Sequence, residues 1–262
     1  MRLRVVTYNI HKGVTGIKGK SRIHNVRDGL HVVNADIVFL QEVQDRNDRL
    51  VAAALFDPDY TQLNYLATDA YPHSVYGRNA VYDHGHHGNA ILSRHPILMS
   101  ENLDISDHRF EQRGLLHAVA DMHGVEAHLI CVHFGLFARS RARQAEALVK
   151  RVQDVVPAEA PLVIAGDFND WNHRLDNLIC TTLGATEVSS AGGARLHTFP
   201  SHMPWWQLDR IYVRGFEIEH ASALTGRDWA QRSDHVPLMA ELARIAVPER
   251  PVAHKVKVGM SS

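Results

Sequence analysis

Short runs of β-branched and other apolar residues recur from one end of the chain to the other, and this feature most limits how the chain can fold. Each run has the length of a single buried β-strand. Residues 115–132 are expected to form a hairpin, because Gly124 between two such runs supplies the positive φ of a tight turn. The expected strands are residues 3–7, 36–40, 90–92, 116–120, 127–132, 162–165, 208–213 and 236–242.

An amphipathic helix is expected over residues 138–156, where apolar side chains recur at helical spacing opposite a charged face. A weaker helical pattern covers residues 26–33. Hairpins combined with strand–helix–strand units indicate an α/β fold with mixed sheets. No linker divides the chain, so residues 1–246 are expected to form one domain, followed by a solvated tail at residues 247–262.

The charge balance excludes a strong electrostatic field around the protein. The 262 residues include 28 Lys and Arg against 29 Asp and Glu, a formal net charge of -1. A nucleic acid is therefore a possible partner that the charge does not favour. The longest apolar stretches fall short of the ~20 residues that cross a bilayer, so no transmembrane segment is expected. The N-terminus lacks the features of a signal peptide, which favours a cytoplasmic location.

Cysteine and histidine usage points to no dedicated metal tract. Cys131 and Cys180 are too few for a disulfide framework and are expected to be reduced thiols. The 19 histidines are scattered, except that three of them lie within residues 83–88. That segment could capture a transition metal, but its glycines favour a solvent loop at the rim of a cleft, with no assigned role.

Polar residues gather at the ends of four expected strands, where a rigid sheet can aim them into a shared cleft. Asn9, Glu42 and Asp234 offer the hard oxygen atoms that Mg²⁺ accepts beside a phosphate, whereas Zn²⁺ favours more histidine or cysteine. Glu42 taken alone is more simply a solvated carboxylate, and it is the joint set that favours a metal site. The four segments are residues 7–11, 41–42, 166–169 and 233–235.

Asp167 and Asn169 lie two residues apart, so in an extended segment both side chains face the same side. The carboxylate could then accept a proton while the neighbouring amide holds a water or a phosphoryl oxygen. An Asx turn after a buried strand explains the same segment equally well.

Seven short motifs follow one another along the chain: Thr7-Tyr8-Asn9, Gln41-Glu42-Val43, residues 88–94, Cys131-Val132-His133-Phe134, residues 166–169, Leu208-Asp209-Arg210-Ile211 and Ser233-Asp234-His235. In this order they resemble the endonuclease/exonuclease/phosphatase superfamily, and most of all its small bacterial members. The resemblance covers residues 5 to about 242. It implies a four-layer α/β sandwich like that of deoxyribonuclease I, in which two packed mixed β-sheets are flanked by helices. It also implies hydrolysis of a phosphoester with Mg²⁺, for which Mn²⁺ is a possible substitute.

The resemblance also implies roles for individual residues. Glu42 corresponds to the principal metal ligand, assisted by Asn9 and Asp234. Asp167 and Asn169 correspond to the residues that position the attacking water and the phosphate.

The histidines complete the implied catalytic set. By the same resemblance, His133 contacts a phosphoryl oxygen and Asp209 orients His235. A neutral histidine held by a carboxylate has a fixed tautomer and a raised basicity. Either Asp167 or His235 could take the proton from water. His11 departs from the abasic-site endonucleases, which carry a second acidic residue there, and His133 stands where that branch has tyrosine, so a repair nuclease is not favoured.

Three further features have weaker support. Arg139 is expected to meet substrate phosphate from the first turn of the long helix, although a charged helix face is more often simply solvated. Asn89 is a candidate phosphate contact, with a strand-edge hydrogen bond equally plausible. The tryptophans of Met203-Pro204-Trp205-Trp206 could stack on a base or touch a lipid interface, but capping of the core is favoured.

The predicted function is Mg²⁺-dependent hydrolysis of a small-molecule or lipid head-group phosphodiester, by in-line attack of water. One alternative is a DNA or RNA endonuclease or exonuclease of the same superfamily. An alternative of another class is a non-catalytic module that binds a phosphate ligand on this fold. The sequence indicates neither one substrate nor an oligomeric state.

Overall fold

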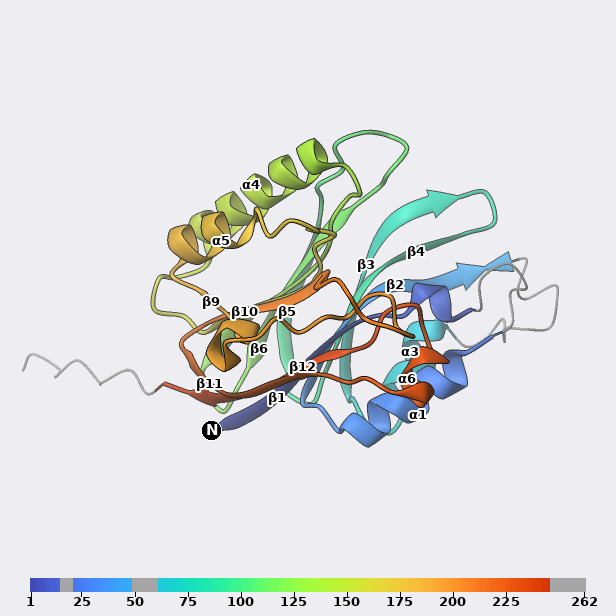
Figure 1. Ribbon diagram of the computed structural model, residues 1–262, viewed down its shortest axis with the longest axis horizontal. Coiled ribbons are helices and arrows are strands. Elements are labelled where there is room, and N and C mark those ends of the chain that lie inside the picture. The colour runs from blue at the N-terminus through green and yellow to red at the C-terminus, as the bar shows by residue number, and fades with distance from the viewer. Residues whose placement is uncertain (15–20, 49–60, 246–262) are drawn as a thin grey trace, which may run out of the picture.

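The computed structural model describes residues 1–14, 21–48 and 61–245, and two six-stranded mixed sheets pack face to face within it (Figure 1). In spatial order, the first sheet contains β11 (Phe216–Ala223), β12 (Leu238–Arg244), β1 (Arg2–Asn9), β2 (Ile37–Asn47), β4 (Gly85–Ser93) and β3 (His73–Tyr82). The second contains β5 (Ile97–Asp104), β6 (Gly114–Asp121), β7 (Glu126–His133), β8 (Leu162–Asp167), β10 (Asp209–Arg214) and β9 (Thr186–Glu187).

Helices cover the outer face of each sheet (Figure 1). α4 (Ala138–Val155) and α5 (Asp176–Leu183) lie on the second sheet, and α1 (Ile23–Val33), α3 (Gln62–Ala67) and α6 (Arg227–Ala230) lie on the first. Two short 3-10 helices, η1 (His11–Gly13) and η2 (Val188–Gly192), complete the described elements. None of the helices in the described ranges is long and apolar enough to cross a membrane.

Three apolar clusters separate the four layers. The central cluster lies between the sheets, and the two outer clusters lie beneath the helices. Alternation along β1 shows the origin of this division, because Leu3 and Val5 face the other sheet while Val6 and Tyr8 face α1. The predicted four-layer α/β sandwich with two mixed sheets is therefore confirmed. Both cysteines are unpaired thiols, Cys131 buried and Cys180 partly exposed.

The strands that the sequence did not predict lie near or at sheet edges. β3, β5 and β11 are half-exposed and rich in polar residues, and β9 has two residues. A strand that buries little surface needs no continuous apolar run. The proposed solvent loop at residues 83–88 was wrong in part, because His86 and His87 belong to β4, while the predicted tail at residues 247–262 lies outside the described residues.

β6 and β7 carry a buried histidine pair beneath α4. His117 Nε2 lies 3.0 Å from His128 Nδ1, and Arg151 of α4 donates from Nε to His117 Nδ1 over 3.3 Å. A neutral His117 with its proton on Nε2 makes both hydrogen bonds. Burial, and then the charges of His128 and Arg151, lower the pKa of His117 to about 4.

We expect the free energy of unfolding to fall as the pH drops from 6.5 towards 4, because the unfolded chain binds a proton at His117 that the folded chain excludes. At pH 5 this one group removes about 2 kcal/mol of stability. In urea unfolding, the free energy of unfolding of His117→Leu should fall by correspondingly less between pH 7 and pH 5. His31→Ala, an exposed control on α1, should show the same fall as the unmodified protein. Equal losses in both variants would contradict the assignment.

Candidate functional site

The polar residues at the strand ends lie along one edge of the sandwich. In the second sheet, Asp167 at the end of β8 pairs in register with both His133 of β7 and Asp209 of β10. In the first sheet, Ser233 Oγ donates to the backbone oxygen of Asn9 over 2.7 Å and so joins the end of β1 to the segment before β12. The two sheets therefore bring their polar ends to a common edge.

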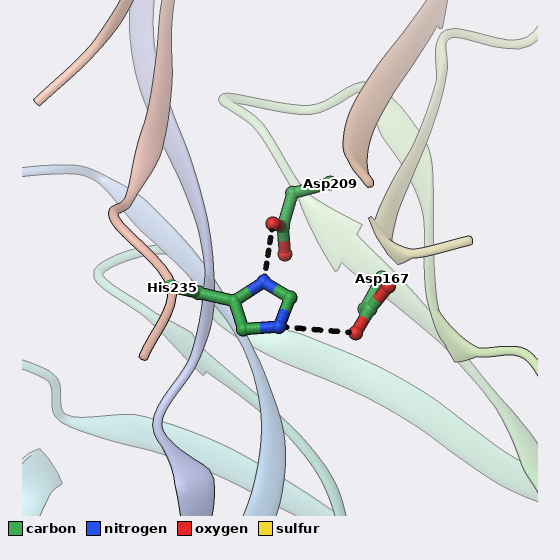
Figure 2. A group of neighbouring side chains, drawn as sticks. All are labelled: Asp167, Asp209 and His235. Carbon is green, nitrogen blue, oxygen red and sulfur yellow. Dashed lines mark hydrogen bonds and ion pairs between the residues drawn. The ribbon is translucent and has the colours of Figure 1, made fainter. Parts of the chain in front are cut away.

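His235 is buried between two carboxylates (Figure 2). Its Nδ1 lies 2.7 Å from Asp209 Oδ2, and its Nε2 lies 3.7 Å from Asp167 Oδ2. Burial alone lowers the pKa of an imidazole, but the charges of Asp209 and Asp167 outweigh it and raise the pKa of His235 to about 10. His235 is therefore an imidazolium at neutral pH, hydrogen bonded to Asp209.

Asp167 Oδ2 is the atom on which the site converges. Asn9 Nδ2 donates to it over 3.0 Å, and His133 Nε2 lies 3.6 Å away. The other carboxylate oxygen accepts the backbone N–H of Asn169 over 2.9 Å. Burial raises the pKa of Asp167 to about 6, in spite of the lowering effect of His235. A carboxylate with a pKa close to neutrality is suited to accept a proton.

The backbone around Asp167 has little freedom. Gly166 has a φ of 153°, and a Cβ at this position would lie 1.9 Å from the backbone oxygen of Val132. Asn169 adopts a φ of 48° and donates its side-chain amide to the backbone oxygen of Phe134 over 2.9 Å. These contacts hold the end of β8 against β7 and fix the direction of the Asp167 carboxylate.

His133 is a neutral imidazole in this site. Burial, followed by repulsion from Arg113 and His235, lowers its pKa well below the usual value. A neutral imidazole can donate a hydrogen bond to a phosphoryl oxygen without carrying a charge itself.

Glu42 lies within β2, whose register with β4 is irregular on both sides of Val43. Its φ of 58° falls in the left-handed region that residues with a Cβ seldom adopt. Its carboxylate makes no hydrogen bond or ion pair to another described residue, and it lines a small cavity with Asn89 and His133. Asn89 donates to the backbone oxygen of Gly114 over 2.9 Å, while its buried Oδ1 has no partner. Two oxygen donors without protein partners suit a hard divalent cation.

Asp234 lies beside His11, with 3.3 Å between Oδ2 and Nδ1. Asn9 Oδ1 accepts the backbone N–H of His11 over 3.1 Å, and the register places Asn9 opposite Gln41, the residue before Glu42. The three predicted metal ligands thus come from neighbouring segments of the first sheet. His11, the position at which the sequence differs from the abasic-site endonucleases, contacts Asp234.

Asp167, Asp209 and His235 offer ligand atoms within 4.8 Å of one another, close enough to hold one ion. His235 is already bonded to Asp209, however, and the raised pKa of its imidazole favours the protonated form, which has no lone pair for a metal. We therefore interpret these three residues as a proton-handling group and place the candidate cation at Glu42.

The sequence predicted a role for one arginine and missed another. Arg139 is exposed in the first turn of α4 and makes no hydrogen bond or ion pair to another described residue. Arg113, which sequence reasoning missed, lines the cavity of Glu42 and His133 and donates to the backbone oxygen of Phe134 over 3.2 Å. Its position directly before β6 was the one sequence feature that could have indicated a place at the strand ends.

The expectation that Trp205 and Trp206 cap the core was wrong, since they are 59% and 43% exposed. Trp206 and Phe199 form an isolated antiparallel bridge. Trp206 packs 5.1 Å from Trp171, and the ring of Phe199 lies 4.9 Å from that of His235. Phe199 and, through it, Trp206 and Trp171 thus lie on one side of His235.

Comparison with known sequences supports the resemblance. The profile of the Endonuclease/Exonuclease/phosphatase family matches residues 6–235. The protein YbhP of Escherichia coli (strain K12) is 40% identical over 242 residues, covering 91% of this chain and 95% of that protein. A UPF0294 protein of Yersinia enterocolitica, YE0917, is 26% identical over 212 residues, which cover 79% of this chain and 73% of that protein.

Solved structures show the same fold. An endonuclease/exonuclease/phosphatase from Beutenbergia cavernae has a TM-score of 0.73 and 19% identity, covering 95% of this chain and 73% of that one. TDP2 of D. rerio, complexed with a single-strand DNA product, has a TM-score of 0.68 and 20% identity, covering 92% and 99%. The mannosyl-6-phosphatase Bt3783 of Bacteroides thetaiotaomicron has a TM-score of 0.68 and 18% identity, also covering 92% and 99%.

We expect Asp209→Asn to lower the pKa of His235 in the metal-free protein, because it removes the hydrogen-bonded charge that favours the imidazolium. Nitrogen-15 NMR of the imidazole as a function of pH measures this shift directly. Asp228→Asn, an exposed control on α6, should leave the titration in place. An unchanged His235 titration in Asp209→Asn would show that the pair is not coupled.

Proposed function

We propose, from the premise that this chain belongs to the Endonuclease/Exonuclease/phosphatase family, that it hydrolyses a small-molecule or lipid head-group phosphodiester with the help of Mg²⁺. Members of this family hydrolyse phosphoester bonds, which agrees with the enzyme class predicted from the sequence. The observation that carries the proposal is the convergence of Asn9, His133 and His235 on the Asp167 carboxylate beside the unpaired Glu42.

Asp167 is the base in the proposed reaction. Its raised pKa lets it take a proton from the attacking water, whereas His235 already carries two ring protons and cannot accept another. Asn169 and Asn9 hold the two oxygens of Asp167 in place. His235 stays cationic through its bond to Asp209 and faces the charge that develops on the phosphoryl oxygens.

Glu42, Asn9 and Asp234 are the residues that would hold Mg²⁺ or Mn²⁺, and their oxygen donors fit such an ion. When bound, the ion supplies Lewis-acid stabilisation of the phosphate and the leaving oxygen. His133 and Asn89, which line the same cavity as Glu42, are placed to contact the phosphate, and Arg113 adds positive charge there. Arg139 stays a proposed outer contact.

A nuclease is the second candidate, since TDP2 of the same fold is seen with single-strand DNA. The net charge of -1 favours a small or lipid diester over a polyanion. A binding module without catalysis is opposed by the intact set of Asp167, Asp209 and His235.

Glu42→Gln and Asp167→Asn should each lower the turnover of bis(p-nitrophenyl) phosphate by roughly 10²- to 10⁴-fold, because the first weakens the cation site and the second removes the base. Circular dichroism should show both variants folded. Glu126→Gln, at the opposite end of β7, is the matched control and should keep full activity. Unchanged turnover of Glu42→Gln with Mg²⁺ would sink the proposal.

Salt dependence separates the two substrate classes. Hydrolysis of a small diester should change little between 50 mM and 200 mM NaCl, because few phosphate charges are neutralised on binding. Affinity for a single-stranded oligonucleotide that spans a basic channel would fall by about 10³-fold or more over the same range. KM measured for both substrates at the two salt concentrations distinguishes these cases. A KM for DNA that rises steeply with salt, together with faster cleavage of DNA than of the small diester, would favour the nuclease.

A further inference from the structure

Large apolar side chains stand exposed at the rim of the site in two clusters. Phe110, Leu136 and Phe137 are 84%, 59% and 64% exposed. Trp205 and Trp206, the second cluster, are 59% and 43% exposed. We call these five residues the apolar rim. Exposed apolar side chains grouped around a site mark an interaction surface, whereas isolated ones are ordinary.

The first cluster is held in place rather than collapsed onto the core. Glu111 Oε1 accepts the backbone N–H of Leu136 over 2.9 Å, and the ring of His108 packs 5.7 Å from that of Phe137. The loop at residues 105–113 is thereby tied to the segment that leads into α4 (Figure 1). The exposed side chains of this cluster are therefore presented by a bonded framework.

Both clusters lie at the catalytic edge. Leu136 lies three residues after His133, with which β7 ends. The indole of Trp206 packs against Trp171, which follows the Asp167 strand end. The edge that carries the proton-handling group thus lies between two sets of exposed apolar side chains.

The charges near the first cluster suit an anionic surface. Arg109 and Arg139 are exposed and pair with no carboxylate among the described residues. The two carboxylates of these loops, Asp107 and Glu111, are already paired with other arginines. Positive charge is therefore left over beside the apolar side chains.

We propose that the apolar rim docks the protein on the surface of a lipid bilayer with anionic head groups, so that the catalytic edge faces phosphodiesters at that surface. Aromatic and aliphatic side chains next to unpaired arginines are the chemistry of interfacial binding. A nucleic acid would find rings on which bases could stack, but two arginines are too few to neutralise a run of backbone phosphates, so its binding is left as an outcome of the test. The identity of the substrate rests on the proposed function, whereas the docking itself does not.

Cosedimentation with phosphatidylcholine vesicles, with and without phosphatidylglycerol, tests the docking in the presence of EDTA so that no turnover occurs. The unmodified protein should bind the anionic vesicles, and Phe110→Ser/Phe137→Ser should weaken the partition by about tenfold or more, because two exposed aromatic contacts are lost. Leu98→Ser/Met99→Ser is the matched control. Those residues are 54% and 51% exposed on β5 near its start, away from the catalytic edge, and the control should bind like the unmodified protein.

A second measurement needs no substitution, which matters if the double variant does not fold. Vesicles of brominated lipid should quench the emission of the exposed Trp205 and Trp206 in the unmodified protein. Absence of vesicle binding and of quenching, or an equal loss of binding in the Leu98→Ser/Met99→Ser control, would overturn the proposal. So would a single-stranded oligonucleotide that binds through Phe110 and Phe137 while vesicles do not. Failure to hydrolyse any phosphodiester would contradict the proposed function and leave a positive docking result standing.

Discussion

A buried imidazolium held between two carboxylates is the interaction on which the rest of the site depends. His235 comes from the segment before β12 in the first sheet, whereas Asp209 and Asp167 come from β10 and β8 in the second. Charges are costly to bury, and removal of one partner leaves the others uncompensated. The group therefore ties the two sheets together at their polar edge and fixes which of the three residues carries the proton.

Backbone strain follows the same edge. Glu42, Asn169 and His11 all have positive φ values, at 58°, 48° and 45°. Such conformations cost roughly 1 to 3 kcal/mol each and persist where surrounding structure enforces them. At Glu42 the positive φ coincides with the irregular register between β2 and β4. At Asn169, hydrogen bonds to Asp167 and to the backbone oxygen of Phe134 hold the conformation. The packing of the two sheets therefore offsets the conformational free energy that these positions cost.

The surroundings of the site separate two kinds of substrate contact. Inside, Glu42, Asn89, His133 and Arg113 line a small polar cavity, where we propose that a phosphate and a cation bind. Outside, the apolar rim offers ring and aliphatic surface beside two exposed arginines, Arg109 and Arg139. In our proposals, different residues recognise the phosphate and contact the molecule that carries it, a division that would let one fold serve different substrates.

The sequence by itself determined the fold class, the central strands and the long helix, because buried strands need continuous apolar runs and an amphipathic helix needs apolar residues at helical spacing. The site residues carried over from the family motifs at the ends of those strands stay predictions. It did not reveal edge strands such as β5, whose exposed side chains leave no such pattern. Only the tertiary structure decided that the pKa of His235 is raised while that of His133 is lowered, since both are buried histidines and differ in which charges surround them. It also decided that the tryptophans face solvent and that Arg113 reaches the cavity, because exposure and long-range approach depend on how distant segments pack.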